Sequence, residues 1–73
     1  MSKFKFTLLI NFRSPIGRQQ SSIKFETDSN DPQVVSSARI KAANSILDWR
    51  CETIDWMLFD EQSNIVDQFA LEY

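Results

Sequence analysis

This chain lacks or nearly lacks three residue types on which many catalytic and ligand-binding motifs depend. Its 73 residues include no histidine, one cysteine and one glycine. Without histidine, the Ser-His-Asp and Cys-His nucleophiles, the histidine zinc sites and the zinc deaminase signature are all excluded. One cysteine cannot build a thiolate metal cage, and one glycine excludes a glycine-rich phosphate loop. The sequence therefore predicts no catalytic residue, no metal and no cofactor, and we expect the protein not to be an enzyme.

The single cysteine is the strongest remaining nucleophile, but its surroundings oppose reactivity. Cys51 lies at the C-terminal end of a predicted helix and is followed by Glu52. Both place negative potential near the sulfur, which disfavours the thiolate. We expect Cys51 to be a small packing residue.

Two groups of acidic residues have structural explanations that are simpler than ligand binding. Residues 28–31 begin like a calcium loop, but Pro32 and Gln33 stand where the third ligand and the glycine belong. A loop ending in a helix cap explains this segment better. Asp60 and Glu61 are neighbours in a predicted exposed turn, where carboxylates keep ordinary acidity and lack a dry pocket.

Charge is distributed unevenly along the chain. Residues 1–50 hold all eight cations and four carboxylates, a formal charge of +4, whereas residues 51–73 hold six carboxylates and no cation, although the whole chain sums to −2. This asymmetry bears on partners and on strand pairing, but it prescribes neither a fold nor a reaction.

Length and composition predict one compact domain spanning residues 1–73. A chain this short has room for one core, and 42% hydrophobic residues with nine aromatics are enough to form it. The longest apolar run has four residues, at 56–59, far below the ~20 that a membrane-spanning helix needs. The single cysteine and the absence of a secretory signal favour a cytoplasmic location, and we expect no membrane partner.

Two strands and a turn are predicted at the start of the chain. From Lys3 to Arg13, apolar residues occupy the even positions, a period of two that is typical of a strand with one buried face. Pro15 and the lone Gly17 then predict a turn, and the alternation over 21–27 predicts a second strand that pairs with the first as a hairpin.

A helix is predicted to follow. Asp31 and Pro32 suit the N-cap and the first helical position. On a helical wheel, one apolar stripe runs to Trp49 and should cover the sheet; its members are Val35, Ala38, Ala42, Ile46 and Trp49.

After the predicted helix, the residues again alternate between two faces with a period of two, as in a strand. Ile54, Trp56 and Leu58 are expected to face the helix, and residues 60–64 supply a polar turn. A last strand begins at Ile65, with one face predicted to comprise Ile65, Asp67, Phe69, Leu71 and Tyr73. The sequence thus predicts an α+β domain: a four-stranded, largely antiparallel sheet with one helix packed on one face, in the order β-β-α-β-β, with the strand order left open.

This arrangement leaves large apolar side chains on the reverse of the sheet. If the even positions of the first strand lie under the helix, Leu9, Met57 and Phe59 point the other way. Contiguous exposed apolar residues commonly form docking sites, so we expect a protein partner there, with Asp55 and Lys5 at the charged margins. A shifted strand, or long cationic side chains lying across the patch, would remove this expectation.

Two charged surfaces offer alternatives. The first hairpin holds five cations that a nucleic acid could contact: Lys3, Lys5, Arg13, Arg18 and Lys24. Cross-strand pairing with acidic neighbours explains these cations more simply, and the sequence pI near 4.9 disfavours nucleic acid. The acidic residues near the C-terminus, Glu52, Asp55, Asp60, Glu61, Asp67 and Glu72, would either steer a basic partner or protect the edge of the last hairpin.

The layout of residues 21–73 (strand, helix ending near Trp49, strand, polar turn, strand) resembles that of the small single-domain proteins by which bacteriophages and other mobile elements inhibit host enzymes, anti-CRISPR proteins among them. The resemblance is in layout alone and transfers no functional residue. It implies a viral inhibitor of a host enzyme or defence complex.

The sequence thus favours a small non-enzymatic protein-binding module. The alternatives are a nucleic-acid-binding domain that uses the basic first hairpin, and a homodimeric structural or accessory subunit joined through the same reverse face.

Overall fold

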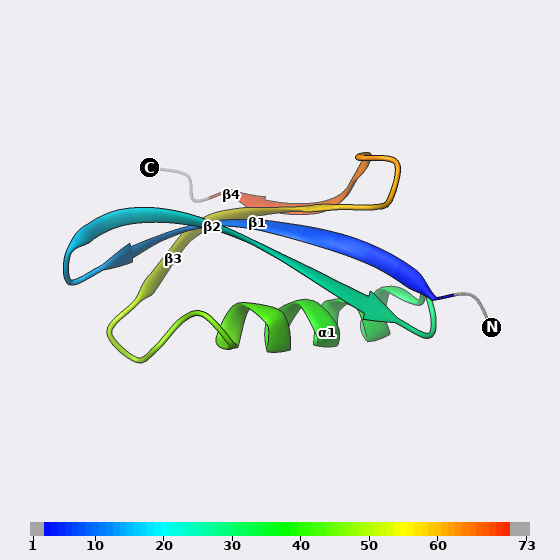
Figure 1. Cartoon of the computed structure of the whole chain (residues 1–73), viewed down its shortest axis with the longest axis horizontal. Helices are drawn as coiled ribbons and strands as arrows, with labels where there is room; N and C mark the ends of the chain where they lie inside the picture. Colours follow the sequence, from blue (N-terminus) through cyan, green and yellow to red (C-terminus); the bar gives the residue numbers. More distant parts are fainter. Residues whose placement is uncertain (1–2, 71–73) are drawn as a thin grey trace.

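The computed structural model describes residues 3–70 as a four-stranded sheet and one helix (Figure 1). The elements are β1 (Phe4–Ser14), β2 (Gly17–Thr27), α1 (Pro32–Asn44), β3 (Glu52–Phe59) and β4 (Ile65–Ala70). The strand order is β2-β1-β3-β4, and every neighbouring pair is antiparallel. The predicted fold class and element order are confirmed.

The β1–β2 hairpin forms where the alternation and the turn residues predict it. Its register is unbroken from the Ser14↔Gly17 pair to the Phe4↔Thr27 pair. Gly17 has φ of +117°, a conformation that strains any residue with a Cβ atom. The second strand is longer than predicted, because it starts at Gly17 and not near Ser21.

The core lies between the even positions of β1 and the helix. Leu8 and Ile10 are almost fully buried, as is Leu58 of β3. Phe6, Phe12, Val35 and Ala43 complete the buried apolar cluster. The expectation that the even-numbered side chains of the first strand lie beneath the helix is therefore confirmed.

The helix begins as predicted but ends early. Asp31 is its N-cap, and the side chain accepts a hydrogen bond of 2.9 Å from the Gln33 N–H. The prediction that the helix reaches Trp49 is wrong, because α1 ends at Asn44 and Trp49 is 90% exposed. Asn44, Ser45 and Asp48 favour side-chain bonds to the backbone, and the Ser45 hydroxyl donates to the Ala42 carbonyl at 2.6 Å.

A bulge in β3 moves one residue that was expected in the core. Asn11 pairs with Asp55 and Phe12 with Thr53, so Ile54 between them has no partner in β1. Leu58 is buried and Trp56 is packed against the core, as predicted, but Ile54 is not. Ile54 instead borders a surface hollow beside Asn11 and Asp55, so its predicted orientation is wrong.

A second bulge divides β4. Leu58 pairs with Asp67 and Phe59 with Ile65, which leaves Val66 as the extra residue. Since cross-strand partners share a face, Ile65 lies on the side of Phe59, whereas Asp67 and Phe69 lie on the helix side. The prediction that Ile65 and Phe69 share one face is therefore wrong; Leu71 and Tyr73, expected on that face, lie outside the described residues.

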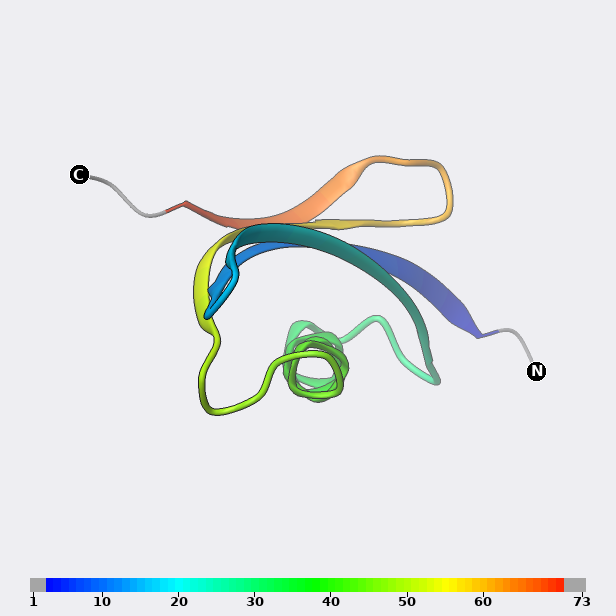
Figure 2. The ribbon, with the colours of Figure 1, turned by 60° about the vertical axis from the view of Figure 1, so that its left-hand side comes forward.

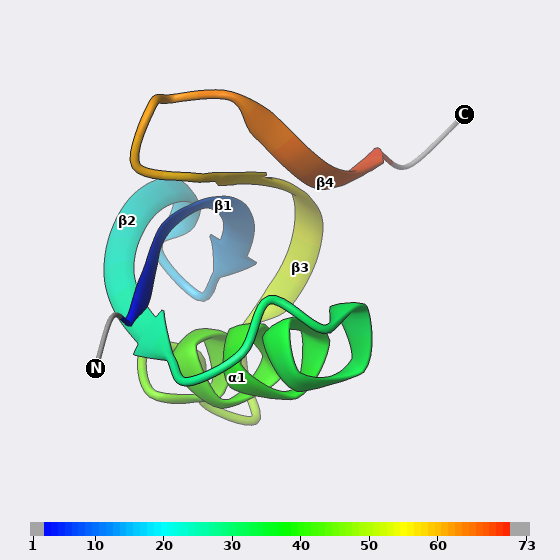
Figure 3. The ribbon, with the colours of Figure 1, turned by 90° about the vertical axis from the view of Figure 1, so that its right-hand side faces the viewer.

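The helix covers only part of the sheet. It packs against β1 and β2, while β4 forms a free edge beyond β3 (Figure 3). Figure 2 shows the curved sheet above the helix, which is seen nearly end-on, with the β3–β4 hairpin on the side away from α1. No helix among residues 3–70 has the length and apolar character to cross a membrane.

Candidate protein-binding face

The candidate site is the face of the sheet turned away from α1, which we call the outer face. It presents the odd-numbered residues of β1 together with their cross-strand partners. The buried even-numbered residues of β1 fix this orientation, because successive side chains of a strand point to opposite faces. The outer face thus follows directly from the packing of the core.

The centre of the outer face is apolar. Leu9 lies directly opposite Met57, and Phe59 lies two residues further along β3. Leu9 and Phe59 are half-buried, and Met57 is 40% exposed. The three predicted residues are therefore brought together on two adjacent strands.

The structure adds a fourth apolar residue to this group. Ile65 of β4 pairs with Phe59 and is exposed. Sequence reasoning missed it, because the bulge at Val66 reverses the face on which Ile65 lies. We name Leu9, Met57, Phe59 and Ile65 the outer apolar patch.

A hydrogen-bonded ladder borders the patch on one side. The Gln20 amide donates to the Asn11 side-chain oxygen at 3.0 Å, and the Asn11 amide donates to the Asp55 carboxylate at 2.5 Å. Asn11 of β1 stands directly opposite Gln20 of β2 on one side and Asp55 of β3 on the other. Asp55, predicted at the margin of the binding surface, thus has a fixed position next to the patch.

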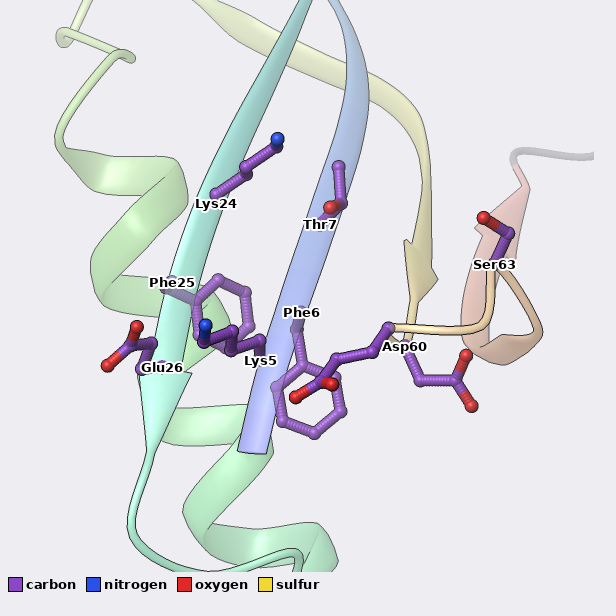
Figure 4. Close-up of a pocket in the computed structure, with 9 residues that line it drawn as sticks. Lys5, Phe6, Thr7, Lys24, Phe25, Glu26, Asp60 and Ser63 are labelled. Atoms are coloured by element: carbon purple, nitrogen blue, oxygen red, sulfur yellow. The ribbon is translucent and has the colours of Figure 1, made fainter. Parts of the chain in front are cut away.

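Charged residues border the patch on its other side. A cleft there is lined by Lys5, Lys24 and Glu26 of the hairpin and by Asp60, Glu61 and Ser63 of the β3–β4 loop (Figure 4). The Asp60 carboxylate accepts the N–H groups of Gln62 and Asn64, both at 2.9 Å, which fixes the loop. Asp60 therefore stabilises the turn in which the sequence predicts it, but its side chain is half-buried and hydrogen-bonded and not freely exposed as expected.

The five cations of the first hairpin fall into separate groups. Thr7 pairs with Lys24, and Arg13 pairs with Arg18 six residues further along β1. At ~3.3 Å per residue, these positions are about 20 Å apart. Lys3 and Lys5 lie at the Lys24 end, and the strand positions between the two groups hold Leu9 and Asn11.

Two of the five hairpin cations stand directly opposite a carboxylate of a neighbouring strand. Lys5 stands opposite Glu26, and Arg13 opposite Glu52. Among residues 3–70, the only ion pair within 4.0 Å joins Asp48 and Arg50, at 3.0 Å. Hydrogen bonds from the side chain and backbone of Arg50 lower the pKa of Asp48 below its ordinary value.

That Asp48–Arg50 turn presents an exposed aromatic residue. Trp49 lies between these two residues in the α1–β3 loop, and Figure 1 shows that loop at the same end of the molecule as the β1–β2 turn. Sequence reasoning assigned it to the core because its spacing continues the apolar stripe of the helix. The polar residues at 44, 45 and 48 were the signal that the helix ends first.

The described residues contain few groups suited to chemistry. Cys51 is half-buried and packs against the core, as predicted. Within residues 3–70, no three Cys, Asp or Glu side chains are grouped to hold a metal ion. The outer face thus combines an apolar centre with polar and charged margins.

Comparison with known proteins adds no relative: no family model, no curated protein and no solved structure matches this chain.

Proposed function

We propose that this protein is a non-enzymatic binding module that docks a partner protein on the outer face of its sheet. The observation that carries the proposal is the outer apolar patch, in which Leu9 and Met57 meet across two strands and Phe59 meets Ile65 across the next pair. Soluble monomers rarely expose contiguous large apolar side chains unless a partner covers them.

The surroundings of the patch support a protein partner. Specific protein interfaces combine an apolar, well-packed centre with a polar rim. Here the rim is formed by the Gln20–Asn11–Asp55 ladder on one side and by the cleft around Lys5 and Lys24 on the other. Both margins are held by the same strands that carry the patch, so the whole surface is preorganised for docking.

The distribution of cations makes nucleic acid the weaker alternative. A phosphate backbone is best followed by a continuous basic track, and specific phosphate contacts accumulate along it. In this protein the Lys5–Lys24 group and the Arg13–Arg18 pair stand at opposite ends of the hairpin. The hairpin positions between them carry Leu9 of the patch and the uncharged residues Asn11 and Gln20.

Inhibition of a host enzyme is the specific form of this function that the layout of the chain suggests. It requires the docked protein to be an enzyme or a defence complex whose activity falls on binding. Once a partner is captured, its activity is measured with and without this protein. A fall in activity would support inhibition, whereas unchanged activity would mean that this protein docks without inhibiting its partner.

The proposal is tested by replacing the two β3 residues of the patch. The double variant Met57→Ser, Phe59→Ser should lose the partner that the native protein captures, while its circular dichroism spectrum stays unchanged. Undiminished capture by the folded double variant would show that the outer face does not dock a partner.

A further inference from the structure

A second apolar surface lies on the helix side of the sheet. Since α1 packs on β1 and β2, the helix side of β4 is left open. Val66 and Phe69 are 47% and 46% exposed there, and Ile40 of α1 is 48% exposed. A sheet face of this kind is normally covered by another layer.

A cavity of about 240 Å³ separates the first turns of α1 from β3 and β4. Val35 and Ser36 line it from the helix, and Leu58, Val66 and Asp67 line it from the sheet. We name this cavity, together with the adjoining residues Arg39, Trp56 and Phe69, the α1–β4 groove. It lies on the opposite side of the sheet from the outer apolar patch.

Arg39 is the cation of the groove and lacks an acidic partner. Its guanidinium carbon lies 4.0 Å from the centroid of the Trp56 ring, and that ring stacks on Phe69 at 6.4 Å. The Arg39 Nε atom is buried, and none of residues 3–70 accepts a hydrogen bond from it. A buried donor without an acceptor is costly, and the partly exposed guanidinium has no ion pair with any described residue, so an anion that reaches the guanidinium would stabilise it.

Asp67 is the matching anion. Its position opposite Leu58 places it on the helix side of β4, where it is exposed. Its carboxylate accepts the Gln68 N–H at 2.8 Å, and it takes part in no ion pair with any described residue. Each copy of the chain thus presents one unpaired cation, on α1 over Trp56 of β3, and one unpaired carboxylate, on the neighbouring edge strand β4.

We propose that the α1–β4 groove is the seam of a twofold homodimer, in which β4 pairs antiparallel with β4 of a second copy and Arg39 binds Asp67 of that copy. Pairing centred on Gln68 places Asp67 of the second copy opposite Phe69, on the helix side. Phe69 is the residue stacked on Trp56 beneath Arg39. The twofold axis repeats the Arg39–Asp67 contact, as an isologous interface requires.

The free edge explains why the occupant is a second copy. An edge strand presents unpaired N–H and C=O groups that another strand can satisfy, and β4 is such a strand. A twofold rotation brings Arg39 of each copy to Asp67 of the other, so both charges are neutralised. A partner surface that carried only positive or only negative charge would instead leave either Arg39 or Asp67 facing a like charge. The resulting eight-stranded sheet keeps both outer faces free, so this inference stands independently of the proposed function.

Charge reversal tests the seam directly. In sedimentation equilibrium, the native protein should form a dimer of twice its 8.5 kDa mass. Arg39→Glu and Asp67→Arg should each raise the dimer dissociation constant at least about tenfold, because each alone brings like charges together at the seam. Glu61→Arg, which reverses an exposed carboxylate outside the groove, should leave the dimer intact.

Mixing the two single variants distinguishes a contact between copies from one within a chain. In the mixed dimer, the carboxylate introduced at 39 faces the guanidinium introduced at 67, and the native Arg39 faces the native Asp67. An equimolar mixture should therefore dimerise with a dissociation constant close to that of the native protein, although each variant alone dimerises more weakly. Circular dichroism checks that each variant is folded. Asp67→Arg is the less disruptive of the two substitutions, because Asp67 is exposed.

Any of the following results would overturn the inference: a native protein that stays at 8.5 kDa up to about 1 mM, a native dimer that the charge reversals leave intact, or single variants that remain monomeric when mixed. A dimer that dissociates on Met57→Ser, Phe59→Ser instead would place the seam on the outer face, and would likewise overturn it.

Discussion

Leu9 and Met57 stand directly opposite each other across β1 and β3, on the face of the sheet that the helix does not cover. Their neighbours along each strand, Leu8 and Leu58, are also paired and are almost fully buried on the helix side. Adjacent residues of the same strand therefore have opposite environments. This alternation separates the residues that form the core from those on the outer face.

The first prediction compares the two faces of β3. Leu58→Ala should lower the free energy of unfolding by about 2–5 kcal/mol, because it opens a cavity in the core. Met57→Ser should change it by less than about 1 kcal/mol, because Met57 is 40% exposed. Urea unfolding followed by fluorescence measures both. Equal losses would mean that Met57 contributes to the core.

The fold was predictable where local chemistry determines it. The alternation of β1, the turn at Gly17 and the cap at Asp31 all depend on neighbouring residues, and the structure confirms each one. The buried face of β1 then follows from the period of two. The position of Leu9, Met57 and Phe59 on the outer face was predictable for the same reason.

Features that depend on pairing between segments far apart in the sequence were not predictable. The bulges at Ile54 and Val66 arise from how β3 matches β1 and β4, which no local pattern encodes. Each bulge shifts the alternation by one residue, so the faces of Ile54 and Ile65 were assigned wrongly. The strand order and the α1–β4 groove likewise depend on packing between segments far apart in the chain.

A second prediction concerns the start of α1. Asp31→Ala should lower the free energy of unfolding by about 1 kcal/mol, because the Gln33 N–H loses its acceptor. Asp28→Ala is the matched control, since Asp28 lies in the same loop and is exposed but does not cap the helix. Thermal unfolding of both variants should separate them, and similar losses would contradict the cap.

A third prediction concerns the two turn residues with a positive φ, Gly17 and Ser63. Gly17→Ala should be destabilising by about 1 kcal/mol or more, because φ of +117° strains an alanine although nothing blocks its Cβ atom. Ser63→Gly should have the opposite sign, because Ser63 holds φ of +65° at the cost that a side chain imposes there. Denaturant midpoints test both signs, and stabilisation by Gly17→Ala would contradict the turn geometry.

A fourth prediction concerns the polar ladder beside the patch. In a double-mutant cycle with Asn11→Ala and Asp55→Ala, the coupling energy should be about 1 kcal/mol, since the partly buried pair shares one hydrogen bond to a carboxylate. Asn11→Ala with Glu61→Ala serves as the uncoupled control. If the changes in unfolding free energy caused by Asn11→Ala and Asp55→Ala simply added, the hydrogen bond between these residues would not be formed in solution.

The most direct measurement of the proposed function is the affinity of a captured partner for matched surface variants. The partner is captured from native lysate on the immobilised protein, identified by mass spectrometry, purified and titrated. Met57→Ser, Phe59→Ser should weaken its affinity by about 30-fold or more, as expected for the centre of an interface. Val34→Ser removes an apolar side chain of similar exposure, 43% against 40% for Met57, from the helix, and should leave the affinity unchanged. Equal affinities for the native protein and the folded double variant would contradict docking on the outer face.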